Sequence, residues 1–532
     1  MVRTTCSIWL LGLTAVCSCA PLAIDVRAEA QAGASAAKPS ATYDVRLPSS
    51  AELWNEEPVV VGCNKQLLVD DYVIAHRYNI ERDLNQASKA NDGKPILVCD
   101  KPWEPANCFQ VQTVRRVDGK FVMHYLYTGC PADYCCQAIS DDGLHWTKPQ
   151  LELREFNGDR NNNLLDHQGA ILFLDPHETD PAHKYKSTFR PMEGSTDPHA
   201  TCLGYSADSL HWHSYNDGHP VTKRAADTLH QMVWDERAQV YRLFTRTDFG
   251  ADGKPCPTDS EFRGNREMIN PDVKANPTDW TTVREWKFDR EGPNEVRRRQ
   301  IHTVNFWQYE GIDFGIMSVM EWPADTQRGA LGPEEDRHER DNWNCYLATR
   351  RGGHECDWDL RWIYDEKPLI PRGPDGAFDK DMVHSASTIV TWDDQHWIYY
   401  TGWPNGHIRH PYQPAIGLAR VPLDRFVYLE PWHKTEPGWI ITKPFEVEGS
   451  QLEMNADANH GSIAVEVLDE HGKPIEGFAR SEAIAVDDAD GLRMVAKWKD
   501  TPDLKSLAGK TVRLKFYLDD AKLYAFQLAK VD

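Results

Sequence analysis

Short runs of β-branched and aromatic residues, broken by Asp, Gly and Asn, follow one another along most of the chain, and helical periodicity is almost absent. Such runs predict β-strands, because branched and aromatic side chains pack well on a pleated surface. Between residues 55 and 430 the runs come in groups of three, and CFQVQTVRRV, KFVMHYLYTG and YCCQAIS form the first group. The pattern predicts an all-β fold made of repeated antiparallel sheets.

Each group ends in a turn that leads to a tryptophan. The stretch ISDDGLHW (139–146) returns as YSADSLHW (205–212), and weaker copies follow in NPTDWTTV and ATRRGGHECDW. A fifth group, IGLARVPLDRF, lacks the Trp but has the same order of a strand run followed by a turn. A unit of roughly seventy residues with three or four strands matches one propeller blade, so residues 55–430 are predicted to form a five-bladed β-propeller. We expect the turns to be scaffold, with four tryptophans at equivalent buried positions: Trp146, Trp212, Trp280 and Trp358.

The pattern of hydrophobic and polar residues changes near Pro437. Residues 437–532 show regular alternation, as in SIAVEVLDEHGKPIEG and TVRLKFYLDDAKLYAFQL. The DDAK and DEHGK stretches are typical of hairpin turns. This part is predicted to be a small C-terminal β-sandwich packed on the propeller.

The first residues have the pattern of a secretory signal. The apolar run IWLLGLTAV follows MVR, and Ala28-Glu29-Ala30 is a candidate cleavage site, so residues 1–30 are predicted to be a signal peptide. Residues 31–54 are predicted to be a flexible leader. The protein is therefore expected to be secreted, to the periplasm or the exterior. Lipid anchoring is the less favoured alternative, because VCSC is a poor lipoprotein box. No later apolar run is long enough to cross a bilayer.

The net charge narrows the choice of partners. A chain of 532 residues with a formal charge of −22 repels phosphate backbones and anionic headgroups. Nucleic acid is therefore excluded as an expected partner, and an acidic polysaccharide needs a local basic pocket. The cysteines after the signal form no CxxC pair, which argues against a zinc knuckle.

The predicted architecture resembles glycoside hydrolase family 32, and its propeller also resembles family 43. The closer likeness is to uncharacterised exported bacterial proteins near those families. It implies the fold and a carbohydrate substrate, but no catalytic residue, because the family 32 Asn-Asp-Pro and Glu-Cys and the third-blade Glu of family 43 are missing. The matching stretches are QLLVDDYVIA (66–75), KPWEPANCF (101–109), ISDDGLHW (139–146) and GKTVRLKFYLDDAKLYAFQL (509–528).

Candidate catalytic residues follow from the blade topology. The first strand of each blade lines the central channel, so side chains just before these strands converge at one end, which we term the channel mouth. Hydrolysis of a glycosidic bond needs two carboxyl groups. The acids at corresponding positions are Glu104, Asp166, Asp227 and Asp381, and Asp71 lies on the segment before the first blade. For each acid the alternative is a turn-capping role.

The other candidates would bind substrate or metal. The fourth blade offers no acid at this position but presents Arg299, Gln300 and His302. Trp403 and His407 follow the second strand of the fifth blade, where Trp403 is either a platform for a sugar ring or packing between blades. No cofactor is expected to be required. The resemblance to family 43 suggests a structural calcium near the axis with His384 beside it, and the alternative is a hydrogen-bonded core histidine.

Three functions of different classes remain open. The first is an exported glycoside hydrolase-like enzyme that acts on polysaccharide or oligosaccharide. The second is a non-catalytic glycan-binding propeller, which the missing signatures favour. The third is a structural or assembly platform, because a fold does not determine a function.

Overall fold

Strands dominate the part of the chain that the computed structural model describes, which is residues 54–126, 134–166, 171–191, 200–223, 230–250, 252–256, 262–288, 297–323, 340–406, 411 and 413–530. Helical structure there is limited to single turns such as α2 (Arg361–Tyr364). None of the described helices has the length and apolar character needed to cross a membrane. Residues 54–532 form one compact unit. The prediction of an all-β chain is confirmed.

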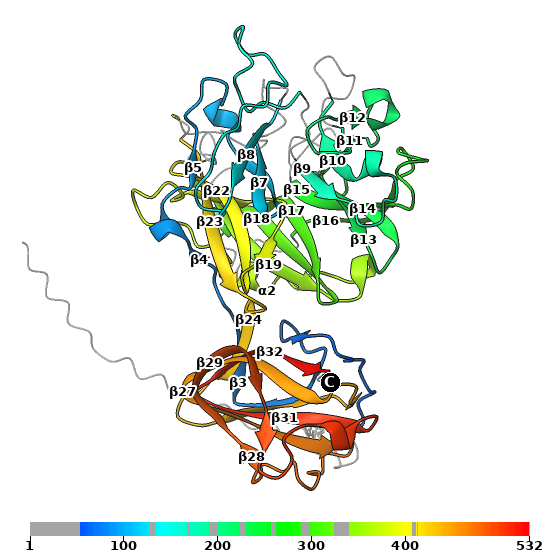
Figure 1. Cartoon of the computed structure of the whole chain (residues 1–532), viewed down its shortest axis with the longest axis vertical. Helices are drawn as coiled ribbons and strands as arrows, with labels where there is room; N and C mark the ends of the chain where they lie inside the picture. The colour runs from blue at the N-terminus through cyan, green and yellow to red at the C-terminus, as the bar shows by residue number, and fades with distance from the viewer. Residues whose placement is uncertain are drawn as a thin grey trace, which may run out of the picture. The chain divides into compact units, whose positions relative to one another are not determined.

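Three antiparallel sheets follow one another in sequence order (Figure 1). Their strands are β6 (Val111–Val117), β7 (Lys120–Tyr125) and β8 (Cys136–Ser140); β9 (Ile171–Leu174), β10 (Tyr185–Phe189), β11 (Cys202–Ser206) and β12 (His213–Ser214); and β13 (Gln231–Asp235), β14 (Val240–Phe249), β15 (Phe262–Asn270) and β16 (Thr281–Trp286). Each sheet contains the three strand runs expected from one repeat.

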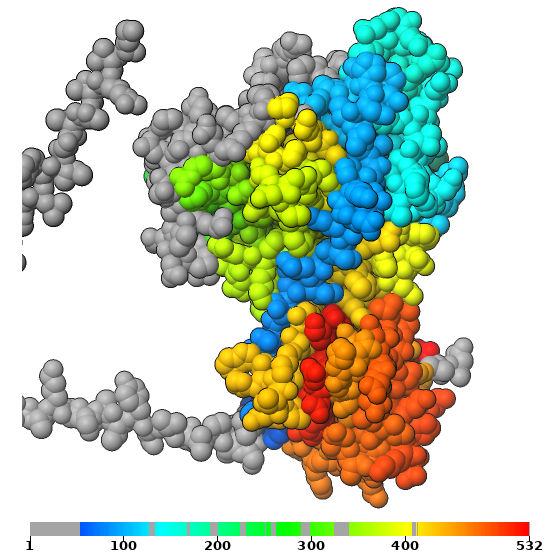
Figure 2. Space-filling view, turned by 90° about the vertical axis from the view of Figure 1, so that its left-hand side faces the viewer, coloured from blue at the N-terminus to red at the C-terminus, as the bar shows by residue number. Residues whose placement is uncertain are grey.

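The fourth and fifth repeats share one nine-stranded sheet instead of forming two. A parallel bridge between Trp343 and Met382 joins β19 to β20. Short strands from before the first repeat complete the fifth group, and Figure 2 shows their blue segment beside the yellow one. The strands are β17 (Arg297–Tyr309), β18 (Ile312–Pro323), β19 (Asn342–Arg350), β20 (Met382–Ser385), β21 (Val390–Trp392), β22 (Gln395–Trp403), β23 (Ala415–Pro422), β4 (Ser88–Lys89) and β5 (Leu97–Val98).

The first strands of the repeats are linked by hydrogen bonds near a common axis. Each bond joins one strand group to another through a buried polar side chain. The links run from Leu172 N to Thr113 Oγ1, from Gln231 Nε2 to Phe306 O, from Asn305 Nδ2 to Ser385 O and from Ser387 Oγ to Gln112 O. The last link returns from the fifth group to the first.

The two clearest copies of the repeated turn have the same structure. In the first, Asp142 Oδ1 accepts hydrogen bonds from the backbone N–H groups of Leu144 and His145, and the Trp146 indole donates to the Gly143 carbonyl. The corresponding bonds of the second copy join Asp208 to Leu210 and His211, and Trp212 to Ser209. Gly143 and Ser209 both have a positive φ, of 75° and 66°. The prediction that these turns are scaffold fits this geometry.

The expected equivalence of the four tryptophans holds in part. Trp280 donates to the carbonyl three residues before it, as Trp146 and Trp212 do, and these three rings are half-buried. Trp358 differs, because its indole donates to Glu267 and it is 7% exposed.

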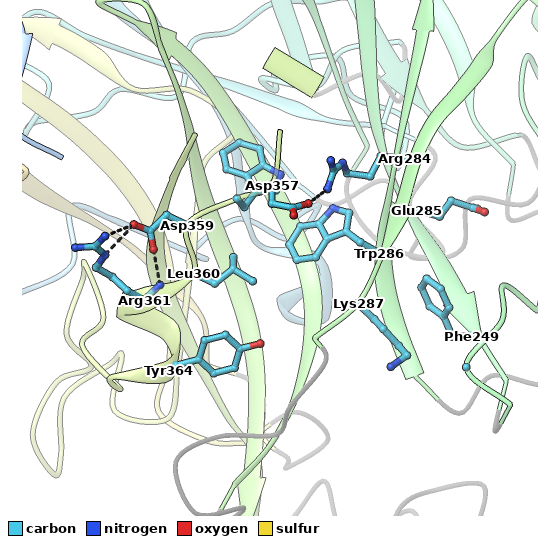
Figure 3. A pocket seen from close by; sticks show the side chains of 12 residues that line it. Phe249, Arg284, Glu285, Trp286, Lys287, Asp357, Asp359, Leu360, Arg361 and Tyr364 are labelled. Carbon is cyan, nitrogen blue, oxygen red and sulfur yellow. Dashed lines mark hydrogen bonds and ion pairs between the residues drawn. The ribbon is translucent and has the colours of Figure 1, made fainter. Parts of the chain in front are cut away.

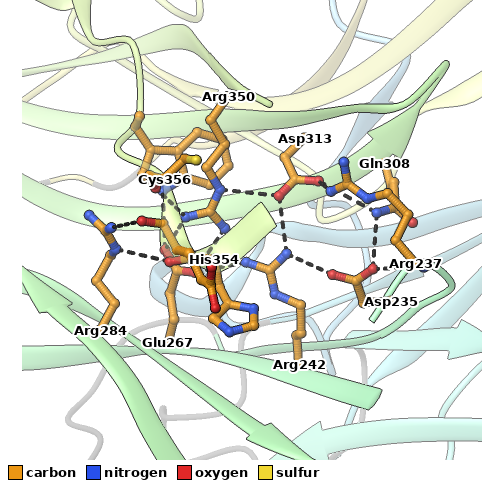
Figure 4. A network of polar contacts seen from close by, with 12 residues as sticks. Asp235, Arg237, Arg242, Glu267, Arg284, Gln308, Asp313, Arg350, His354 and Cys356 are labelled. Atoms are coloured by element: carbon orange, nitrogen blue, oxygen red, sulfur yellow. Dashed lines mark hydrogen bonds and ion pairs between the residues drawn. The ribbon is translucent and has the colours of Figure 1, made fainter. Parts of the chain in front are cut away.

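A buried charge network joins the third sheet to β18 and β19 (Figure 4). Arg242 Nη1 lies 3.1 Å from both Asp235 and Asp313, and its Nη2 lies 2.8 Å from Glu267. Arg350 binds Asp313 and Glu267 from the other side, at 3.1 and 2.9 Å. Burial alone would raise the pKa of Glu267, but the two guanidinium groups hold it below its usual value. The network fixes the third sheet against the fourth group.

Seven C-terminal strands, together with three strands from residues 66–84, form a ten-stranded antiparallel sheet around one apolar core, beside a separate pair of short strands. The sheet is continuous because β27 (Gln451–Asp469) pairs with β32 in its first half and with β31 in its second half. The other strands from this end are β24 (Val427–Pro431), β25 (Gly438–Thr442), β26 (Phe445–Glu446), β29 (Val486–Val495), β31 (Thr511–Asp519) and β32 (Lys522–Ala529), and the short pair is β28 (Ala483–Ile484) with β30 (Lys497–Trp498).

The segment before the first repeat differs from its predicted place in the propeller. Residues 66–84 join the C-terminal sheet: β1 (Gln66–Leu67) pairs with β32, β2 (Ile74–Tyr78) with β25 and β3 (Ile80–Leu84) with β24. β24 itself precedes the expected boundary at Pro437. These pairings cover backbone groups that the C-terminal strands alone would leave open at their edges.

Candidate functional site

Neutral polar side chains fill the axis between the first strands. The His384 ring is fully buried, with Nδ1 2.9 Å from Gln110 Nε2 and Nε2 3.0 Å from Thr303 Oγ1. Burial lowers the pKa of His384 to about 4, so the imidazole is neutral at pH 7. Gln231 and Asn305 continue this lining with their amide groups. The described part of the axis thus offers hydrogen-bonding groups and no ionised one.

Asp381 lies immediately before β20, the position that the sequence predicts for an acid of the channel mouth. Its backbone N–H donates to the Trp403 carbonyl, and its carbonyl accepts from the Trp343 N–H, both at 3.1 Å. The side chain is 15% exposed, and Lys380 Nζ lies 2.5 Å from Oδ1. The carboxylate is therefore held at the end of three strands while still in contact with solvent.

Aromatic rings gather beside Asp381. The ring centroids of Trp343 and Trp403 are 6.2 Å apart, and His302 lies against Trp343 at 4.1 Å. Trp403 is 8% exposed and belongs to an apolar cluster with Met320, so its main contacts are packing between strand groups. Among the predicted substrate-binding residues, Trp403 contacts the Asp381 backbone directly, and the half-buried His302 lies against Trp343 and His384.

Glu104 is part of the first repeat and not of this cluster. Its side chain is buried, with Lys148 Nζ at 2.7 Å and the Tyr125 hydroxyl donating at 2.7 Å. Its other oxygen accepts from the backbone N–H groups of Asp100 and Lys101. A carboxylate with both oxygens engaged in this way stabilises the turn, so we do not retain Glu104 in the catalytic pair.

The remaining predicted acids lie at different places. Asp71 lies between β1 and β2, against Arg82 and Arg77, and its side chain is 52% exposed, so it is far from the position expected for a channel acid. Burial would raise the pKa of Asp71, but Arg82 lowers it. Asp166 is exposed, five residues before β9. Asp227 and His407 lie outside the described residues.

Arg299 and Gln300 are both buried. Arg299 is buried and donates to Glu321 at 2.5 Å and to Glu366 at 3.0 Å. Gln300 is 3% exposed. The sequence placed both at the start of a first strand, but because β17 begins at Arg297 they lie inside the sheet, where a guanidinium needs carboxylate partners.

No group of three or more His, Cys, Asp or Glu side chains suited to a metal occurs among the residues that the structure describes. Both ring nitrogens of His384 have hydrogen-bond partners, which fits the alternative of a core histidine. Calcium near the axis stays a prediction.

Sequence reasoning missed Trp343 and Lys380. Trp343 lies at the start of a third strand, which gave no reason to expect it near a first strand. The parallel bridge to Met382 is a long-range contact, which a local sequence pattern does not predict. Lys380 precedes Asp381 directly and could have been noticed as a charge partner.

Comparisons with known proteins give structural likeness only. No protein family model matches the chain, and no curated protein matches it. Solved structures similar to it include a thermostable family-43 glycoside hydrolase, at 11% identity over 59% of this chain and 89% of that chain, with a TM-score of 0.37. Others are the Bombyx mori GH32 β-fructofuranosidase (10% identity, 82% and 94% coverage, TM-score 0.32) and the catalytic domain of the Coprinopsis cinerea GH62 α-L-arabinofuranosidase (9%, 63% and 97%, 0.37).

Proposed function

We propose that the protein is an exported glycoside hydrolase-like enzyme that cleaves glycosidic bonds of polysaccharides or oligosaccharides at the channel mouth. The observation that supports this most is the position of Asp381: a carboxylate at the end of the axis, fixed by backbone bonds to two tryptophans and still 15% exposed. Cys108 is disulfide-bonded, which is compatible with export.

The proposal includes the architecture. The three separate sheets and the two halves of the nine-stranded sheet are taken as five propeller blades, and the C-terminal sheet with its short strand pair as the accessory β-sandwich domain. In this arrangement the starts of the first strands surround one end of the axis, and Asp381, immediately before β20, is the described acid expected there.

The chemistry assigns different roles to two carboxyl groups. Asp381, beside the Lys380 ammonium, suits the ionised partner that acts as nucleophile or base. The general acid must come from another strand group, and Asp227 is the predicted candidate because it precedes β13 by the same logic by which Asp381 precedes β20. Asp166 is the alternative. His302 and the ring of Trp343 would contact the sugar next to the scissile bond.

A non-catalytic glycan-binding protein is the second candidate. The neutral lining of the axis favours it, because Gln110, His384 and Thr303 supply no second carboxylate. Under this reading Asp381 would bind sugar hydroxyls without transferring a proton.

A panel of aryl glycosides and plant or algal oligosaccharides separates the two candidates. The enzyme hypothesis predicts release of product from at least one substrate, with Asp227→Asn and Asp381→Asn each losing turnover while the thermal unfolding profile stays that of the wild type. Binding of an oligosaccharide without any turnover favours the second candidate. Neither binding nor turnover favours a structural platform.

A further inference from the structure

A second concave surface lies between the third sheet and the segment that follows β19. It is a groove of about 710 Å³, within the range of small-ligand sites of about 300–1,000 Å³. Its walls come from the end of β14, from β16 and from residues 357–364 (Figure 3). Neither Asp381 nor its neighbours at the channel mouth line this groove, so it is a separate site.

Aromatic rings supply the apolar part of the groove. Phe249, Trp286 and Tyr364 line it, and Trp286 lies at its centre in Figure 3. Trp286 and Tyr364 are half-buried, so part of each ring is available to a ligand. The Trp286 Nε1 atom is buried and has no acceptor among the described residues.

Two of the three cations that line the groove are paired with carboxylates, and Glu285, which also lines it, accepts a hydrogen bond from Thr247. Arg284 binds Asp357, and Arg361 binds Asp359 at 2.7 Å. Lys287 has no carboxylate partner in the described part of the chain, and its ammonium lies over the Phe262 ring at 5.1 Å. Figure 3 shows the Lys287 ammonium and the Tyr364 hydroxyl turned toward the same gap below Trp286. On a protein with a net charge of −22, this cation marks a place where an anionic group is attracted.

We propose that this groove binds an acidic oligosaccharide, with a uronate carboxylate on Lys287 and a sugar ring against Trp286 and Tyr364. The aromatic faces match the C–H faces of a pyranose, and the paired Arg284 and Asp357 at the rim offer donors and acceptors to hydroxyl groups. The proposal takes the carbohydrate class from the proposed function but adds a second site and its charge preference. Such a site would hold an acidic polysaccharide while the channel mouth acts on it.

The test is calorimetric titration of the full chain carrying Asp381→Asn, which excludes turnover during the measurement. The probes are a galacturonic acid trimer and a galactose trimer. We expect the acidic trimer to bind more tightly, Lys287→Gln to weaken its binding by about tenfold or more, and Lys287→Arg to retain it. Lys120→Gln, which removes an exposed lysine of the first sheet, is the matched control and should leave the affinity unchanged.

Three results would overturn the proposal: equal affinity for the neutral trimer, a Lys287→Gln affinity within twofold of its parent, or equal binding of an acidic peptide of the same charge. The result is independent of the channel mouth. If the wild type hydrolyses nothing but Lys287→Gln still loses the acidic trimer, the groove stands and the enzyme hypothesis fails. If hydrolysis is found but Lys287→Gln does not change the affinity for the acidic trimer, the enzyme hypothesis stands and the groove proposal fails.

Discussion

The side chains of Gln110 and His384 lie 2.9 Å apart, although 274 residues separate them in sequence. Gln110 immediately precedes the first strand of the first repeat, and His384 lies on the first strand of the fifth. The second ring nitrogen of His384 contacts Thr303 on the fourth. One neutral imidazole thus connects three strand groups near the axis, and its protonation would break a contact on which the closed arrangement depends.

Stability should therefore fall as the solution is acidified from pH 6.5 to pH 4. Burial lowers the pKa of His384 to about 4 in the folded state, against an ordinary value of 6.5, so the unfolded chain binds the extra proton in this window. The contribution at full effect is roughly 3 kcal/mol. His384→Gln should flatten the dependence of the unfolding free energy on pH, measured by urea denaturation between pH 4 and 7.

Burial also lowers the pKa of His396 to about 4. His396 therefore also makes the unfolding free energy fall on acidification, and this part of the pH dependence remains in His384→Gln. An unchanged slope in His384→Gln would show that this ring is charged in the folded protein.

The repeated turn should depend on its aspartate. Asp142→Ala removes the acceptor of two backbone N–H groups and should lower the unfolding free energy by about 1–2 kcal/mol. Asp141, the adjacent residue, has a side chain that is 85% exposed, so Asp141→Ala should change it by no more than about 0.5 kcal/mol. Equal effects of the two changes in chemical denaturation would refute the turn geometry.

The buried charge network should be sensitive to loss of one member. Arg350→Met leaves Asp313 and Glu267 with fewer cationic partners in a desolvated site and should cost about 3–5 kcal/mol. Arg493→Met, which removes an exposed pair with Asp394, should cost at most about 1 kcal/mol. The comparison is made by the midpoint of guanidinium denaturation, and a small loss in Arg350→Met would mean that the network is hydrated.

The repeat tryptophans should differ in their contribution to stability. Trp358→Ala empties a buried site and should cost about 3–5 kcal/mol, whereas Trp146→Ala, at a half-buried ring, should cost less. Thermal unfolding of both variants measures the difference. Equal losses would restore the equivalence that the spacing of the repeats predicts.

Local chemistry made the all-β fold and the turns predictable from sequence. The Asp–His–Trp spacing is visible because all its hydrogen bonds lie within three residues of one another, as in Asp142 and His145. The pairing of β2 with β25 was not predictable, because the strands are far apart in sequence and the alternation in QLLVDDYVIA fits an edge strand of either domain. Long-range pairing decides such cases.

The same limit applies to the candidate site. The position of Asp381 before a first strand followed from the repeat, and in the structure it immediately precedes β20. Glu104 had the same position by sequence, but Lys148, 44 residues away, occupies its carboxylate. In the same way, Arg299 on β17 pairs with Glu321, its cross-strand neighbour on β18. The partners of a charged residue are set by tertiary contacts, which a pattern of strands does not encode.

The ratio of kcat/KM between the wild type and Asp381→Asn, on a substrate found with the glycoside panel, tests the central claim most directly. The substitution removes the ionisable group with little change in volume, so the account predicts a loss of about 10²–10⁴-fold with an unchanged unfolding profile. Asp71→Asn, at an exposed acid away from the axis, should keep the kcat/KM of the wild type. An Asp381→Asn enzyme with the full wild-type kcat/KM would contradict the assignment of the site to the channel mouth.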